Sequence, residues 1–145
     1  MAHAYASLHV PESPDEVWRL IGGFGSLPDW LPYIPGSDLS EGGRVRRLTN
    51  QGGETIVERL EEFDNRTRSY SYSILQAPFP VTGYLSTIRV EAADGSGSRV
   101  EWAGRFTPQG ISDDQASKLF QSIYEDGLKA LASSLAARRS RSNSA

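Results

Sequence analysis

The residues best suited to chemistry in this 145-residue chain are a glutamate and several hydroxyl side chains on segments with strand spacing. In ETIVERLEE, residues 54–62, alternation places Ile56, Glu58 and Leu60 on one side. A carboxylate between two apolar neighbours is costly to bury unless it is paired, protonated or hydrogen-bonded. Such a group suits general acid–base catalysis, so Glu58 is the first candidate catalytic residue. The alternative is a structural ion pair that only fixes strand register, and the residues leave both open.

An arginine of the preceding segment is the expected partner of Glu58. In RVRRLT, residues 44–49, Arg44 and Arg46 share one face and Arg47 lies on the other, so alternation alone does not select the inward one. We choose Arg46. In an enzyme, Arg46 or tyrosine hydroxyls would stabilise an enolate-like oxyanion beside Glu58.

Hydroxyl side chains recur on the same faces as apolar residues in two further segments. Alternation groups Tyr70 and Tyr72 with Ile74, and it groups Tyr84 and Ser86 with Ile88. Buried hydroxyls need hydrogen-bond partners. For each tyrosine alone, core packing is the simpler interpretation. Several inward hydroxyls beside one inward carboxylate together favour a mainly apolar pocket with a few polar groups.

Other chemistries find little support in the composition. The chain has no cysteine and two histidines, so we expect no metal site and no cofactor. We find no Ser-His or Cys-His pair for covalent catalysis. A net charge of −3 argues against nucleic-acid binding by the folded domain. Without a long apolar run or a secretory leader, we expect a soluble, cytoplasmic protein that does not enter membranes.

The segments that must position these residues form an α+β pattern. A strand at 4–10 precedes two short helices, at 13–23 with Ser13 as N-cap and at 26–31. Strand patterns separated by glycine-rich or turn residues follow at 37–41, 44–49, 54–63, 67–75, 82–92 and 98–107. Such short connections predict an antiparallel meander.

A long amphipathic helix is predicted from Ser112 to about Arg138. Leu119, Ile123 and Gly127 lie on one stripe of it, and we expect this stripe to line the floor of a cavity. A sheet curved around one helix cannot easily fill the space beneath both, which favours such a cavity. We predict a single domain at 1–137 and a basic, disordered tail at 138–145.

The order of elements resembles the START/SRPBCC superfamily of helix-grip, birch-pollen-allergen-like proteins. The resemblance also rests on ERLEEFD at 58–64, on the proline-bearing loop APFP at 77–80, and on Gly83 with Tyr84. Within the superfamily the chain looks like bacterial polyketide cyclase/dehydrase-type members. It is more distantly similar to plant abscisic-acid receptors and lachrymatory factor synthase. The resemblance implies a curved seven-stranded antiparallel sheet wrapped around a long C-terminal helix.

The resemblance to the receptors also implies site residues. Positions matching Glu58, Tyr84, Ser86 and Glu101 face the ligand cavity there. Strand alternation instead turns Trp102 inward, and at this position we follow the resemblance. Two mobile loops of the receptors correspond to residues 49–53 and 77–81 of this chain. The second loop adds Phe79 and Val81 to the expected ligand-binding residues. Both loop sequences, NQGG and FPV, depart from the receptor patterns, so hormone signalling is not carried over.

These observations predict a protein that binds a small, largely apolar or amphipathic organic molecule between the sheet and the last helix. The alternative is a polyketide cyclase, dehydratase or isomerase that uses Glu58 as general acid/base. The chemical identity of the ligand and the oligomeric state do not follow from the sequence.

Overall fold

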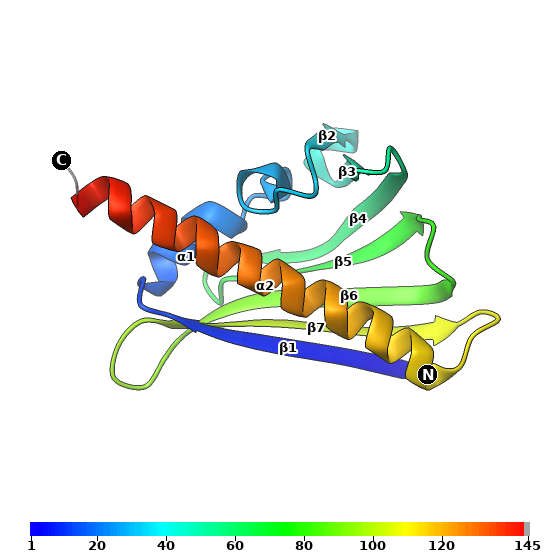
Figure 1. Ribbon diagram of the computed structural model, residues 1–145. Coiled ribbons are helices and arrows are strands. Elements are labelled where there is room, and N and C mark those ends of the chain that lie inside the picture. Colours follow the sequence, from blue (N-terminus) through cyan, green and yellow to red (C-terminus); the bar gives the residue numbers. More distant parts are fainter. Residues whose placement is uncertain (144–145) are drawn as a thin grey trace.

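The computed structural model of the chain describes residues 1–143 and confirms the helix-grip architecture (Figure 1). Its seven-stranded antiparallel sheet has the order β1-β7-β6-β5-β4-β3-β2. The strands are β1 (Ala2–Val10), β2 (Gly36–Ser40), β3 (Val45–Thr49), β4 (Thr55–Asp64), β5 (Ser69–Gln76), β6 (Val81–Ala92) and β7 (Ser98–Pro108). Strands β2 to β7 form the predicted meander, and β1 returns to pair with β7.

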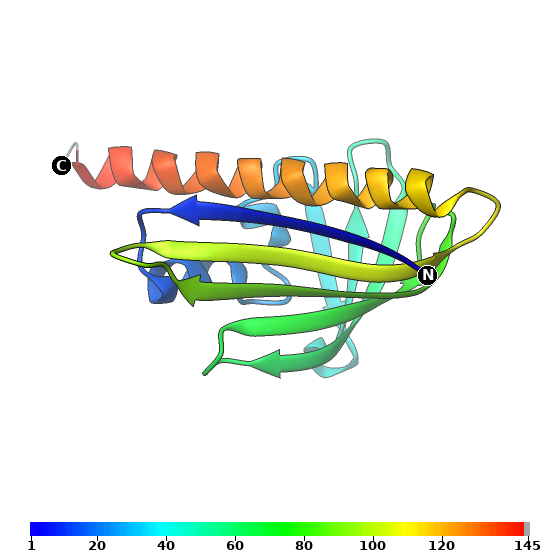
Figure 2. The ribbon, with the colours of Figure 1, turned by 90° about the horizontal axis from the view of Figure 1, so that it is seen from below.

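Irregularities in strand pairing accompany the curvature of the sheet. Register shifts lie between Val57 and Glu58, between Leu60 and Glu62 on β4, and between Thr82 and Leu85 on β6. Bulges of this kind bend a strand and increase its twist. The curved sheet therefore leaves a concave face, which α2 (Asp113–Asn143) crosses (Figure 1; Figure 2).

Helix α1 (Pro14–Ile21) begins at its predicted N-cap, and a serine also caps the start of α2. Ser13 Oγ accepts a hydrogen bond from the Glu16 amide at the start of α1. At α2, Ser112 Oγ accepts from the Gln115 amide, and Gln115 Oε1 accepts from the Ser112 amide in return. The second predicted helix is a short 3-10 turn, η1 (Leu27–Asp29), and another such turn, η2 (Glu41–Gly43), joins β2 to β3.

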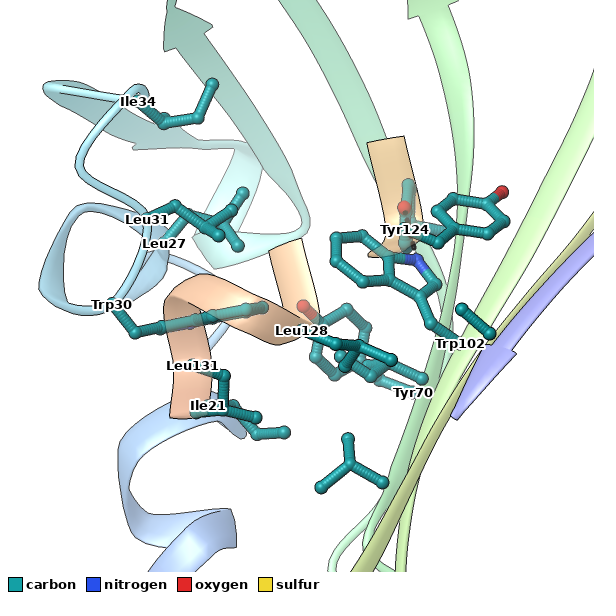
Figure 3. Packing of buried hydrophobic residues seen from close by; sticks show 14 of the residues in the cluster. Ile21, Leu27, Trp30, Leu31, Ile34, Tyr70, Trp102, Tyr124, Leu128 and Leu131 are labelled. Atoms are coloured by element: carbon teal, nitrogen blue, oxygen red, sulfur yellow. Dashed lines mark hydrogen bonds between the residues drawn. The ribbon is translucent and has the colours of Figure 1, made fainter. Parts of the chain in front are cut away.

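The core lies between the concave face of the sheet, α2, and the segment from α1 to η1 (Figure 3). One face of α2 is buried along its length, through Ala116, Phe120, Tyr124, Leu128, Leu131 and Leu135. From the other side, Ile21, Leu27, Trp30 and Leu31 pack toward it. Burial of this apolar surface supplies most of the stabilisation of such a domain. None of the helices within residues 1–143 has the length and apolar character needed to cross a membrane.

The C-terminal boundary differs from the prediction of a disordered tail from 138. Helix α2 continues through Asn143, so residues 138–143 are helical, and the last two residues lie outside the described part. Arg139 forms an ion pair with Glu12, whose side chain is only 7% exposed. This contact ties the last turns of α2 to the segment before α1.

Candidate functional site

A cavity of about 240 Å³ lies between the concave face of the sheet, α2 and the segment after η1. Apolar and aromatic side chains form most of its wall, with a few polar groups among them. The lining residues are Leu27, Leu31, Tyr33, Ile34, Arg46, Leu48, Asn50, Ile56, Glu58, Tyr72, Ile74, Phe79, Tyr84, Trp102, Phe120 and Ile123. The β3–β4 loop contributes Asn50 and the β5–β6 loop contributes Phe79, so both loops expected to border the cavity reach it.

Arg46 and Glu58 form a buried ion pair on the β3–β4 side of the cavity. The two residues are direct cross-strand partners, which places both side chains on the concave face. Arg46 Nε donates to Glu58 Oε1 at 2.8 Å, and Nη2 lies 2.7 Å from the same oxygen. The side chains are 1% and 9% exposed, respectively. Removing two charges from water is costly, so the neighbours of the pair matter.

Those neighbours hold the Arg46 guanidinium in one place. Its Nη1 donates to the Phe24 carbonyl at 3.1 Å and to the Tyr70 hydroxyl at 3.3 Å. Its central carbon lies 4.2 Å from the ring centroid of Phe24 and 4.8 Å from that of Tyr72. Cation–π contacts of this kind are strongest where water is excluded. Arg46 is therefore committed to protein partners, and it positions Glu58.

Glu58 keeps one oxygen available to the cavity. Both contacts with Arg46 use Oε1, and no hydrogen bond from the side chains described within residues 1–141 reaches Oε2. Oε2 is not fully enclosed by protein atoms, and Glu58 lines the cavity, so we place this oxygen at the cavity wall. Burial raises the pKa of Glu58 above its ordinary value, against the opposing effect of Arg46.

A second wall, built by β5, β6, β7 and α2, carries a connected set of neutral hydroxyls. Trp102 Nε1 donates to the Tyr72 hydroxyl and to Ser86 Oγ, each at 3.1 Å. The hydroxyl oxygens of Tyr84 and Tyr124 lie 2.5 Å apart, and those of Tyr72 and Tyr84 lie 3.4 Å apart.

Ser86 Oγ completes this network by donating to the Ala103 carbonyl at 2.9 Å. Burial raises the pKa of Tyr72 and of Tyr84 well above 10 and that of Tyr124 to about 12. All three phenols are therefore neutral at physiological pH, and their hydroxyls are satisfied within the protein.

Two glycines allow this wall to close. A Cβ on Gly104 would collide with the Tyr124 hydroxyl, so β7 admits the tyrosine only where a side chain is missing. A Cβ on Gly127 would lie 2.5 Å from the Trp102 ring and 3.3 Å from the Tyr33 hydroxyl. Gly127 therefore lets the Trp102 ring stack on Tyr124, with ring centroids 4.9 Å apart (Figure 3).

Tyr33, from the segment between η1 and β2, brings an unpaired polar atom to the cavity wall. Its hydroxyl is buried and has no hydrogen-bond partner among the described residues. Burial, and to a smaller extent Asp126, raises the pKa of Tyr33 to about 12. A buried hydroxyl without a partner forgoes the hydrogen bonds that it makes with water in the unfolded chain, so the position is a local weakness of the wall.

Half of the residues proposed from the sequence line this cavity. They are Arg46, Glu58, Tyr72, Phe79, Tyr84 and Ile123. Tyr70 lies behind Arg46 as a hydrogen-bond acceptor, and Ser86 is bonded within the tyrosine network. Gly127 acts through Trp102 and Tyr33. Val81 and Leu119 pack against the core without forming the cavity wall.

Glu101 is placed on the opposite face of the sheet, which corrects the expectation taken from the receptors. Its carboxylate accepts a hydrogen bond from the Tyr5 hydroxyl at 3.1 Å, and its side chain is 25% exposed. Trp102, the next residue, is buried and lines the cavity. Adjacent strand residues point to opposite faces, so both cannot face inward in a regular strand. Strand alternation was the better guide here.

Several cavity residues were not proposed from the sequence. Tyr33, Ile34, Leu48 and Asn50 come from loops or short strands, where periodicity is weak. Trp102 was available from strand alternation, and Phe120 from the apolar stripe of the last helix. The remaining apolar members are core residues, and no sequence signal separates a cavity wall from a filled core.

The chain is similar to solved bacterial structures over most of its length. The protein XoxI from Bacillus cereus is 60% identical with a TM-score of 0.89, and the match covers 92% of this chain and 94% of that one. A protein from Bacillus thuringiensis is also 60% identical, with a TM-score of 0.88 and coverage of 90% and 96%. A Nitrosospira multiformis protein, 21% identical with a TM-score of 0.77 and coverage of 90% and 94%, shares the fold.

No curated protein matches this chain. The family model described as polyketide cyclase/dehydrase and lipid transport matches residues 1–136. That match covers the sheet, the short helices and most of α2, including every residue of the cavity wall. The chain therefore belongs to the polyketide cyclase/dehydrase and lipid transport family.

Proposed function

We propose that the protein binds a small, largely apolar organic molecule in the cavity between the sheet and α2. The observation that carries this proposal is the unpaired Glu58 Oε2 on an otherwise apolar and aromatic wall. Small-molecule sites commonly combine apolar walls with a few placed polar groups. The family description supports the same general role.

The test is native mass spectrometry of the freshly purified protein, which detects a co-purifying molecule by its added mass. The matched control is Ile123→Trp, because Ile123 lines the cavity from α2 and is only partly buried, so the larger ring fills the cavity. We expect the added mass in the natural chain and its loss in the variant, with the melting temperature retained. Equal retention by both proteins would place the molecule elsewhere and overturn the proposal.

A second candidate function is acid–base catalysis on a carbonyl compound, with Glu58 as the base. It is favoured by the combination of a Glu58 oxygen without a hydrogen-bond partner and a pKa raised by burial, which makes the carboxylate a stronger proton acceptor. In this role Glu58 removes a proton from the carbon next to the carbonyl, and the neutral tyrosine wall limits access by water.

This activity can be tested with a bicyclic ketone, 2-tetralone, dissolved in D₂O. Loss of the proton signal next to the carbonyl, followed by NMR, reports abstraction and return of the proton as deuterium. We expect exchange faster than in buffer, reduced at least tenfold by Glu58→Gln. Equal exchange rates for the two proteins would leave Glu58 as a binding group only.

A further inference from the structure

The size, charge and polar groups of the cavity define a narrower class of ligand than the family description does. We infer that the site takes a compact, neutral molecule of one or two rings that donates a hydrogen bond to Glu58 Oε2. Long-chain lipids, polycyclic polyketides and organic anions are excluded from the cavity. This inference rests on the proposed function and specifies its ligand.

The volume sets the upper limit on ligand size. The cavity measures about 240 Å³. Pockets for drug-sized ligands usually begin at about 300 Å³. A two-ring aromatic compound fits this space, whereas a four-ring skeleton or a long acyl chain does not.

The wall is braced against expansion. Trp102 is held by hydrogen bonds to Tyr72 and Ser86, and Tyr84 is held by Tyr124. On the other side, the Arg46 guanidinium is fixed by Glu58, Phe24 and Tyr70. Enlarging the cavity on these sides requires breaking buried hydrogen bonds, which costs more than displacing apolar side chains.

The charge distribution selects a neutral ligand. Arg46 donates to Glu58, to a backbone carbonyl and to a tyrosine, so its positive charge is already engaged and the side chain is 1% exposed. A ligand carboxylate would place a second negative charge beside Glu58 with no available cation among the lining residues. Like charges at close range in a buried site are strongly unfavourable.

The polar contact selects a hydrogen-bond donor. Glu58 lines the cavity, and its Oε2 receives no hydrogen bond from the side chains described within residues 1–141. An ionised carboxylate only accepts hydrogen bonds, and such charge-assisted bonds are stronger than neutral ones. A phenol or alcohol hydroxyl meets this requirement, whereas an ether on the same ring system does not.

Isothermal titration calorimetry with matched two-ring probes tests the polar group and the charge. The probes are 2-naphthol, 2-methoxynaphthalene and 2-naphthoate, which share one ring system and differ in the substituent. We expect 2-naphthol to bind at least tenfold more tightly than the other two. Glu58→Gln is expected to remove most of this preference. Equal or tighter binding of 2-naphthoate would overturn the charge assignment.

The size limit is tested with estradiol, a neutral phenol with four rings. We expect no binding by the natural chain, and measurable binding by the double variant Phe79→Ala/Ile123→Ala, whose two altered residues line the cavity and are only partly buried. If the natural chain binds estradiol as tightly as 2-naphthol, the size assignment fails while the proposed function stands. If no probe binds to any of these proteins and no molecule co-purifies, the proposed function itself fails.

Discussion

The two walls of the cavity satisfy their buried polar groups in different ways. On the β3–β4 side, two full charges meet, and every contact with the arginine falls on one carboxylate oxygen. On the side of β6, β7 and α2, neutral hydroxyls and an indole bond one another and a backbone carbonyl. The charged wall, with Arg46 and Glu58, leaves Glu58 Oε2 free to accept a hydrogen bond. In the neutral wall, with the tyrosines, Ser86 and Trp102, the polar groups bond one another or the backbone. We therefore expect the charged wall to hydrogen-bond the ligand and the neutral wall to set the shape of the cavity.

The largest effect is expected from Arg46→Met, which leaves Glu58 buried without its cation. Removing one partner of a buried ion pair costs about 3–5 kcal/mol. Chemical denaturation measures the free energy of unfolding. The matched control is Arg47→Met, because Arg47 neighbours Arg46 on β3 but is exposed. The double variant Arg46→Met/Glu58→Leu should regain most of the loss, and a cost no larger than that of Arg47→Met would contradict the role given to the pair.

The next effect is expected from Gly127→Leu, which changes the shape of the neutral wall. The new side chain would collide with the Trp102 ring and displace it from Tyr124. Overpacking of this kind costs about 1–3 kcal/mol, despite the better helix propensity of leucine. Thermal and chemical unfolding measure it, with Lys129→Leu on the exposed face of α2 as control. A variant as stable as that control would show that Trp102 is free to move.

Removing one hydroxyl from the neutral wall should have a moderate effect. Tyr84→Phe deprives the Tyr124 hydroxyl of its 2.5 Å partner. We expect a loss of about 1–2 kcal/mol in the free energy of unfolding, because a buried hydroxyl is left unmet. The control is Tyr5→Phe, whose hydroxyl bonds are exposed. Equal costs for the two variants would mean that the buried network adds nothing beyond surface contacts.

The pH dependence of stability separates the two walls further. The pKa of Glu58 is raised in the folded state, so the folded protein binds this proton more strongly than the unfolded chain does. The corresponding stabilisation is complete below the ordinary glutamate pKa, about 4.3, and is lost as pH rises through the folded pKa. Chemical denaturation at a series of pH values above about 4.3 should show this loss of stability in the natural chain and no such loss in Glu58→Gln. Parallel pH profiles would contradict the raised pKa.

The smallest effect is expected from Tyr33→Phe. The Tyr33 hydroxyl is buried without a partner, so its removal sacrifices no hydrogen bond within the described residues. We expect the free energy of unfolding to stay within about 0.5 kcal/mol of the natural value or to rise slightly. The free energies of unfolding of Tyr33→Phe and Tyr84→Phe are compared directly, because each variant loses a phenol oxygen and only the Tyr84 oxygen has a hydrogen-bond partner. A loss as large as that of Tyr84→Phe would reveal a partner for Tyr33.

Periodicity and capping residues were sufficient to predict the order of elements. The period of two in TRSYSYSIL and the helical spacing from Ser112 correspond to β5 and α2, and the predicted N-cap Ser13 marks the start of α1. These signals are local, because they depend on which face of a single element is apolar. The same logic placed Glu58 on the concave face.

Tertiary structure decided what the local signals left open. Arg46 rather than Arg44 meets Glu58 because of the register between β3 and β4, which a pattern within one strand does not contain. Tyr84 finds Tyr124, and Trp102 finds Ser86, across elements that are distant in sequence. Near the end of α2, Arg139 pairs with Glu12, a residue distant in sequence.

The alternation of residues along the strands predicted that several hydroxyls and one carboxylate would be buried and would need hydrogen-bond partners. Only the packing of sheet against helix decided which groups supply them and which carboxylate oxygen stays open. Cavity volume belongs to the same class of property, because it is the small difference between the space that the backbone encloses and the side chains that fill it. For that reason, the sequence by itself determined a helix-grip domain with polar groups inside, whereas the tertiary structure decided the size and the open acceptor of its cavity.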